Sequence, residues 1–361
     1  MKMHRKSNIE LLRIIAIFLI IVFHCVYKSG FSFEQDLSTN KLIVKTFWMF
    51  GELGVNLFFL IMGYFMINGS FKIKKLILII AQVFFYHLIT IILGNYIGIY
   101  EISNFRSLFA TFFPITSNFY WYITVYILLY IFSPYITILC RNMTKATYQR
   151  FLVMLLVLYS FIPTFLGVFY NTTESLLYYN RLIWGIIVYF IGAYIKLYSI
   201  SLINTKKKSI ILACVSALVM LVSILVIEKF NNFFAIIGIN ESAYLWTPNN
   251  APMIFLSISI FNIFANLKIK ENIFINKLAS TTLGIYLLHD GILANWLWKI
   301  VFKTKVYQNS YILLFYIIGC GITVFIVGAC VDLIRQIIEK NTIKRIIDSN
   351  TFNKLFKERK N

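Results

Sequence analysis

Ten apolar segments follow one another along this chain, each long enough to cross the hydrocarbon core of a bilayer, about 30 Å thick, as an α-helix. Of the 361 residues, 60% are hydrophobic and 13% are charged, whereas soluble domains carry about 25% charged residues. Because lipid offers no partner for backbone N–H and C=O groups, such segments must pair them internally, as helices do. We therefore predict an all-α integral membrane protein, a bundle of about ten transmembrane helices, over residues 9–27, 47–68, 76–98, 119–139, 151–169, 181–198, 209–228, 251–267, 281–300 and 311–334.

The basic residues fall mainly in alternate loops between these segments. The chain has 34 Lys and Arg against 14 Asp and Glu, a net charge of +20. With both termini in the cytosol, 24 basic residues lie on the inner side and 9 in the outer loops, as the positive-inside rule requires. This predicts an N-in/C-in topology, with a transmembrane domain over 1–335 and a basic cytoplasmic tail over 336–361. The topology accounts for the charge, so we expect no nucleic-acid partner.

Several common features are not expected. The segment 9–27 is long enough to span and no small-residue cleavage site follows it, which predicts that it stays in the mature protein. The five cysteines lie in or at the ends of apolar segments and form no CxxC pair, so we predict neither a disulfide framework nor a metal site.

The longer outer loops, 28–46, 100–118 and 230–250, are rich in Ser, Asn and aromatic residues that suit contact with a sugar.

Arg13 and His24 are the strongly polar residues inside the first segment. His24 lies eleven positions after Arg13, about three helical turns, so both project from nearly the same face, roughly 16 Å apart along the axis. An ionisable residue in a span costs roughly 2.5–3.5 kcal/mol on insertion scales and is a functional candidate by default. Arg13 could instead anchor the helix end by snorkelling, and His24 could be a satisfied core residue. Glu10 either pairs with Arg13 or forms a capping box with Ser7.

Further polar and aromatic residues are candidates for substrate contact. Glu52 and Asn56 are four residues apart in the second segment and should share a helix face. His289 and Asp290 lie about halfway through the ninth segment, where polar neighbours need a cavity or a partner. The remaining candidates also fit an aromatic belt or a simple topology signal; they are Trp121, Tyr122, Tyr126 and Tyr130 in the fourth segment and Lys72, Lys74 and Lys75 after the second.

These residues together resemble the acyltransferase-3 family of multi-pass membrane acyltransferases. The resemblance covers essentially the whole chain and rests on four motifs: Arg13-x10-His24, then Gly51-x2-Gly54-Val55-x2-Phe58-Phe59-x3-Gly63-Tyr64, then Trp121-x4-Tyr126-x3-Tyr130, and Gly284-Ile285-Tyr286-Leu287-x-His289-Asp290. Asn56 stands where many members have Asp, and Tyr126 where some have Glu. The resemblance therefore gives no acid at these two positions here.

The resemblance implies transfer of an acyl group, usually acetyl from cytosolic acetyl-CoA, to a hydroxyl of a cell-surface glycan. Within the family the chain is similar to stand-alone O-acetyltransferases of capsule and exopolysaccharide in Gram-positive bacteria, which implies a bacterial plasma membrane and no fused hydrolase-like domain. No permanently bound cofactor or metal is expected. The acceptor is either the polysaccharide or its lipid-linked precursor, and the oligomeric state is left open.

On this hypothesis Arg13 and the lysines Lys72, Lys74 and Lys75 hold the donor, and His24, whose imidazole titrates near neutral pH, acts as general base. Glu52 and Asn56 assist it, and Glu10, the fourth-segment aromatics, His289 and Asp290 line the cavity. Direct transfer and a transient acetyl-enzyme are both compatible with these residues. The competing interpretations are a polysaccharide flippase, a polymerase of the same pathway, or an acyltransferase acting on a small molecule or a protein.

Overall fold

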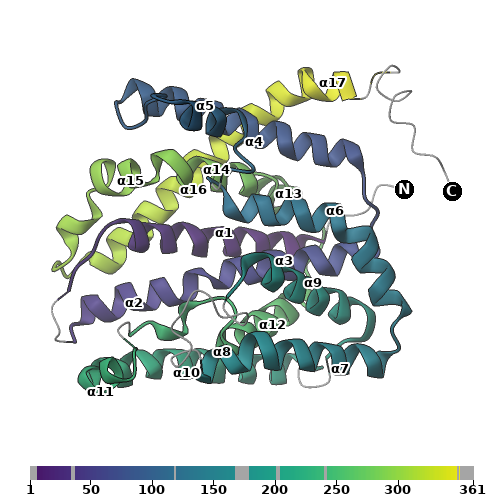
Figure 1. Ribbon diagram of the computed structural model, residues 1–361, viewed down its shortest axis with the longest axis vertical. Coiled ribbons are helices and arrows are strands. Elements are labelled where there is room, and N and C mark those ends of the chain that lie inside the picture. The colour runs from purple at the N-terminus through teal and green to yellow at the C-terminus, as the bar shows by residue number, and fades with distance from the viewer. Residues whose placement is uncertain are drawn as a thin grey trace.

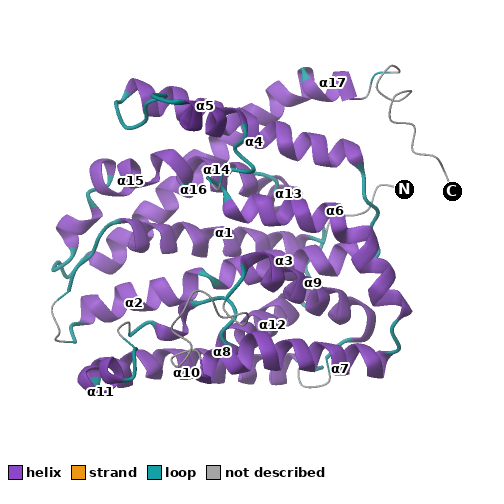
Figure 2. Cartoon of the chain, in the orientation of Figure 1, coloured by secondary structure: helices purple, strands orange, loops and turns teal. Residues whose placement is uncertain are grey.

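The structure is a computed structural model that describes residues 6–33, 37–117, 119–166, 179–200, 204–239, 242–347 and 349. Figure 2 shows helices joined by loops, with no strand in these ranges. The elements are α1 (Ser7–Lys28), α2 (Thr39–Gly51), α3 (Leu53–Met66), α4 (Ile73–Tyr96), α5 (Phe105–Phe112), α6 (Trp121–Asn142), α7 (Lys145–Leu156), η1 (Val157–Phe161), α8 (Ile162–Leu166), α9 (Arg181–Tyr198), α10 (Lys206–Lys229), α11 (Asn231–Ile236), η4 (Tyr244–Trp246), α12 (Ala251–Ala265), α13 (Ile273–Ala279), α14 (Thr282–His289), η5 (Gly291–Leu293), α15 (Ala294–Trp296), η6 (Leu297–Val301), η7 (Thr304–Tyr307), α16 (Leu313–Asn341) and α17 (Ile343–Ile347).

The predicted helical class is confirmed, and eight of the ten predicted segments are long, apolar helices that could each cross a membrane, counted over the described ranges. The eighth predicted segment is α12, whose 15 residues extend only about 22 Å. The ninth is broken into α14, η5, α15 and η6. Residues 167–169 of the fifth segment and all of the predicted tail after Ile347 except Ser349 lie outside the described residues.

The second segment begins earlier than the sequence predicts. Ser38 caps the start of α2 by accepting a hydrogen bond from the Lys41 backbone N–H, 3.1 Å away. Helix α2 then runs to Gly51, and α3 begins at Leu53. Much of the predicted outer loop 28–46 is therefore helix, because a local capping residue starts the helix in a stretch with too few apolar residues to be recognised as a span.

The break in the ninth segment occurs at Asp290, whose backbone is extended, and at Gly291, whose φ is +78°. A Cβ at Gly291 would lie 2.9 Å from the ring of Tyr120. Glycine is required here both by the left-handed backbone and by the space available. The break stops α14 in the interior of the bundle, so that its last residue, His289, and the next, Asp290, both lie at the centre of the protein.

Helix α1 is the central element of the bundle. It packs against α2, α3, α12, α13, α14 and α16, and in Figure 1 it runs through the middle, with α4 and α5 on one side and α7 and α10 on the other. Other helices therefore surround most of α1. Its few polar side chains face other helices or an internal cavity rather than lipid.

Candidate active site

A cavity of about 830 Å³ lies beside α1 along the whole length of that helix. Its lining on α1 begins at Lys6, passes Arg13 and His24 and ends at Lys28. Twenty-two residues of helix rise about 33 Å, which matches the hydrocarbon thickness of a bilayer. The other walls come from α3, α4, α6, α9 and α14, with Gly51 at the end of α2 and Trp246 in η4. Arg13 and His24 thus line one cavity at two depths, as their spacing predicts.

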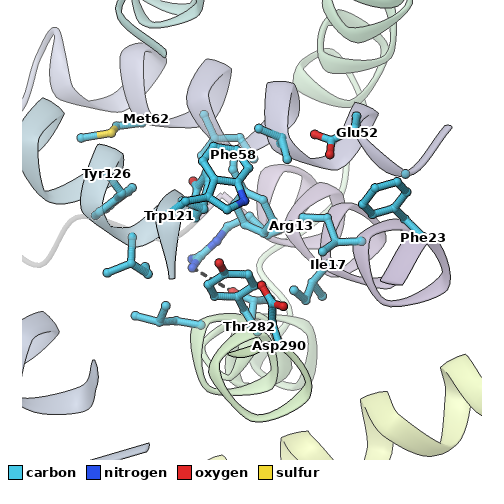
Figure 3. Close-up of a pocket in the computed structure, with 18 of the residues that line it drawn as sticks. Arg13, Ile17, Phe23, Glu52, Phe58, Met62, Trp121, Tyr126, Thr282 and Asp290 are labelled. Carbon is cyan, nitrogen blue, oxygen red and sulfur yellow. Dashed lines mark hydrogen bonds between the residues drawn. The ribbon is translucent and has the colours of Figure 1, made fainter. Parts of the chain in front are cut away.

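Arg13 is held by two neighbours on different helices. One terminal nitrogen donates to Glu10 Oε2 at 3.0 Å and the other to Thr282 Oγ1 at 3.2 Å. Figure 3 shows the guanidinium crossing from α1 towards α14, with Trp121 above it. Both partners of Arg13 line the cavity. The guanidinium is therefore fixed in place inside the cavity, which favours a functional cation over a snorkelling anchor.

The structure also decides between the two interpretations of Glu10. Ser7 is the first residue of α1 rather than its N-cap. Its hydroxyl donates to Asn276 Oδ1 at 2.9 Å and accepts from the Asn272 backbone N–H at 2.8 Å. The capping box is therefore wrong, because Ser7 ties α1 to α13 instead, and Glu10 pairs with Arg13.

His24 meets His289 across the cavity wall, with Nδ1 of His24 3.0 Å from Nε2 of His289. The second ring nitrogen of His289, Nδ1, lies 2.6 Å from the carbonyl oxygen of Ile285. A carbonyl only accepts, so His289 Nδ1 carries the proton and its Nε2 accepts from His24 Nδ1. In the neutral form His24 then has no proton on Nε2. The carbonyl at the end of this chain fixes which nitrogen of His24 is basic.

Asp290 completes this cluster on the cavity side. Its Oδ2 lies 4.0 Å from His24 Nε2, and its Oδ1 lies 3.3 Å from Lys28 Nζ. All three side chains line the cavity. A proton taken up by His24 Nε2 would thus face a carboxylate, whose own charge is balanced by Lys28 while the imidazole is neutral. Such an arrangement suits a base that gains and loses a proton in each reaction cycle.

The prediction that Glu52 and Asn56 share a helix face is wrong. Glu52 lies at the junction of α2 and α3 and faces the cavity, with Oε2 buried and without a hydrogen-bond partner within the described part of the chain. Asn56 is fully buried away from the cavity. Its amide donates to the Pro248 carbonyl and Ser257 Oγ and accepts from Trp184 Nε1. With every polar atom of Asn56 used, its place here is to join α3 to α9 and α12.

Of the three lysines predicted to hold the donor, only one lines the cavity. Lys75 lines the cavity and lies 4.9 Å above the ring of Tyr130. Lys72, Lys74 and Tyr130 do not line it; the Tyr130 hydroxyl accepts from the Lys72 backbone N–H at 3.0 Å. Trp121, Tyr122 and Tyr126 line the cavity as predicted. His289 does not line it and acts on it through His24.

Some lining residues were not predicted from the sequence. Lys6, Lys28 and Arg181 lie at or just outside the ends of the predicted segments 9–27 and 181–198, yet each lines the cavity. Arg181 lies 4.5 Å above the ring of Trp121. Thr282 and Gln82 carry no charge and stand in apolar segments, so only the three-dimensional contact with Arg13 or the cavity marks them.

The charges are unevenly distributed along the cavity. Around the first half of α1 stand Lys6, Arg13 and Lys75 with one carboxylate, Glu10. Around the second half Lys28 and Arg181 face Glu52 and Asp290. The first half therefore carries a net positive charge that would attract an anionic ligand, and the second half is balanced.

Comparison with protein-family models matches residues 6–331 to the acyltransferase domain of the acyltransferase-3 family. No significant match was found among curated proteins or among solved structures. The family match begins at Lys6 and ends inside α16, so it covers every helix that lines the cavity. By this match the chain belongs to the acyltransferase-3 family, and it is a multi-pass membrane acyltransferase.

Proposed function

We propose that this protein moves an acetyl group from cytosolic acetyl-CoA to a hydroxyl of a cell-surface polysaccharide or its lipid-linked precursor, with His24 as general base. The observation that carries the proposal is the hydrogen-bond chain from Ile285 through His289 to His24, which leaves an unprotonated Nε2 at a cavity running the length of α1. The membrane is that of a bacterial cell.

The donor would occupy the positive half of the cavity. Its phosphates would meet Lys6, Lys75 and Arg13, which face the end of α1 that the positive-inside rule assigns to the cytosol. From Arg13 to His24 is about 16 Å along the helix. An extended pantetheine arm can cover such a distance, so the charged part of the donor can stay at Arg13 while the thioester lies at His24.

The chemical step follows from the position of His24 Nε2. This nitrogen takes the proton of the acceptor hydroxyl while the hydroxyl oxygen attacks the carbonyl carbon of the thioester. The C–O bond forms, the C–S bond breaks, and the leaving thiolate takes the proton from His24. Asp290, 4.0 Å from Nε2, stabilises the imidazolium between these two proton transfers. The aromatic residues that line the second half of the cavity, together with the Glu52 side chain, would orient the sugar.

The test is the His24→Ala variant. Removing the base should lower acetyl transfer by at least about 100-fold, measured as loss of O-acetyl signals in NMR spectra of the surface polysaccharide and as loss of thiol release in membrane vesicles. His87→Gln is the matched control, because His87 is also a buried histidine, but its Nε2 donates to the Ala110 carbonyl oxygen at 3.3 Å and it does not line the cavity.

Two outcomes would contradict the proposal. Acetylation retained in His24→Ala at equal membrane abundance would remove His24 from the chemistry. Unchanged O-acetyl content in cells that lack the whole protein, together with shortened or unexported polymer, would favour a polymerase or a flippase.

A further inference from the structure

A second cavity, of about 540 Å³, lies at the end of α1 that is predicted to face outward. It is formed by the last turn of α1 and the loop after it, by α2 from Lys41 to Trp48, by the end of α10, by α11, and by Ile239 and Ser242 after α11. Its volume falls in the range of roughly 300–1,000 Å³ typical of ligand sites. None of its residues belongs to the donor half of the first cavity.

The second cavity adjoins the first through a wall of aromatic rings. Tyr27 lines both cavities and lies three residues, about 4.5 Å of helix rise, beyond His24. The ring of Trp48, in the second cavity, packs edge-on against Tyr27 at 5.2 Å and against Trp246, in the first, at 6.2 Å. A molecule bound in the second cavity would therefore begin within about one helical turn of the proposed base.

The lining of the second cavity combines aromatic faces with polar groups. Phe31 and Phe33 stack at 6.1 Å near Tyr27 and Trp48. Lys41 and Glu228 form an ion pair of 2.6 Å with both side chains nearly buried. Asn231, Asn232, Ser32 and Ser242 add amides and hydroxyls.

Two buried donors of this lining have no partner among the described residues. Ser242 is 5% exposed and its hydroxyl makes no hydrogen bond. The indole N–H of Trp48 is likewise buried and unpaired. A buried polar group without a partner costs about 1–3 kcal/mol, so a ligand that brought an acceptor to either donor would stabilise the protein.

The chemistry of this lining selects one ligand class. A lipid chain would offer no hydrogen-bond partner to the amides and hydroxyls of this lining. A pyranose ring presents an apolar C–H face that packs on an aromatic ring, and a rim of hydroxyls that pairs with amides and a carboxylate. We infer that the second cavity is an acceptor subsite, which binds the sugar residues next to the one whose hydroxyl lies at His24.

This inference rests on the proposed function for the identity of the reaction, and it adds that the acceptor is recognised as an oligosaccharide rather than as a single sugar. The subsite would hold the chain while the neighbouring hydroxyl passes the Tyr27–Trp48–Trp246 wall. A monosaccharide could reach His24 but would leave the second cavity empty. Acceptor length should therefore change KM for the acceptor much more than kcat.

The experiment uses the full-length protein in lipid nanodiscs and oligosaccharides of one to four sugar residues, prepared by partial acid hydrolysis of the surface polysaccharide. Calorimetric titration should show the wild-type protein binding the tetrasaccharide at least about tenfold more tightly than the monosaccharide, a difference of about 1.4 kcal/mol. Ala235→Trp places an indole at the rim of the second cavity, since Ala235 is exposed and lines it. It should remove this preference and leave monosaccharide binding unchanged.

Ile236→Trp is the matched control, because Ile236 is the next residue of α11, is 84% exposed and does not line the cavity. It should bind both sugars as the wild type does. Asn232→Ala removes one rim amide without adding bulk, and should weaken tetrasaccharide binding about two- to tenfold. Equal affinity of the wild type for both lengths, or an Ala235→Trp variant that keeps the preference, would overturn the inference. Length-dependent binding without acyl transfer would instead overturn the proposed function.

Discussion

At the residue scale, the side chain that most clearly defines the chemistry of this site is one that does not touch the cavity. His289 contacts the cavity only through His24, yet its bond to the Ile285 carbonyl determines which nitrogen of His24 is free to accept a proton. The residue is therefore a positioning residue in the proposed reaction. The pattern His289-Asp290 can be recognised in the sequence, but the pairing with His24, 265 residues away, cannot.

This role predicts a graded response to substitution at His289. His289→Ala removes the acceptor for His24 Nδ1 and should lower kcat about 100-fold, since misoriented general bases lose most of their contribution. His289→Gln supplies an amide oxygen that can accept the same hydrogen bond, and should recover a measurable part of that rate. Both are measured as thiol release from the acyl donor in vesicles. Equal loss in the two variants at equal protein abundance would indicate a packing role instead.

At the scale of the element, α14 is the helix that brings the site together. Its first residue, Thr282, contacts Arg13 and its last, His289, contacts His24. The helix is held from behind by α16, where the fully buried Asp332 accepts hydrogen bonds from Tyr86, Gln82, Arg335 and Gln336. Gln82 also lines the cavity. This buried network therefore connects the position of α14 to the shape of the site.

The contact between α14 and α16 leaves no room for a side chain at Gly284. A Cβ there would lie 2.1 Å from Asp332 Oδ1. Gly284→Ala should destabilise the protein by about 1–3 kcal/mol through overpacking, seen as a lower thermal unfolding midpoint in detergent, and should reduce activity. Gly319→Ala is the control, because nothing lies within 4 Å of its added Cβ and alanine favours helix by about 1 kcal/mol. An unchanged midpoint for Gly284→Ala would contradict this packing.

At the scale of the whole molecule, sequence patterns predicted the positions of the helices better than they predicted which side chains contact one another. Hydropathy identified eight helices long enough to span, because lipid forces a long apolar run to form one, whereas the eighth segment is the shorter α12 and the ninth is broken. It did not reveal the break at Gly291 or the early start of α2, which depend on one backbone angle and one capping side chain. The orientation of Asn56 was also unpredictable, because α3 is apolar and buried on nearly every side, so its periodicity gives no direction.

The membrane orientation makes a further prediction for the whole molecule. In a variant with all five cysteines replaced, Phe233→Cys in α11 should react with a membrane-impermeant maleimide added to intact cells. Lys207→Cys in the first turn of α10 should react only after permeabilisation, since both positions are exposed and Phe233 lies in α11, just beyond the opposite end of α10. The reverse labelling pattern would place the positive half of the cavity outside the cell and contradict the assignment of the donor side.

The central position of α1 has a consequence for how the protein is made. Arg13 and His24 enter the membrane first, but their partners Thr282 and His289 follow 269 and 265 residues later. At synthesis rates of about 5–20 residues per second, that interval lasts roughly 13–54 s. During this time Arg13 has Glu10 on its own helix as a partner, but His24 lacks His289 and depends on earlier neighbours or the insertion machinery to shield it. The candidate site is complete only after His289 has been synthesised, so a product truncated before that residue lacks it.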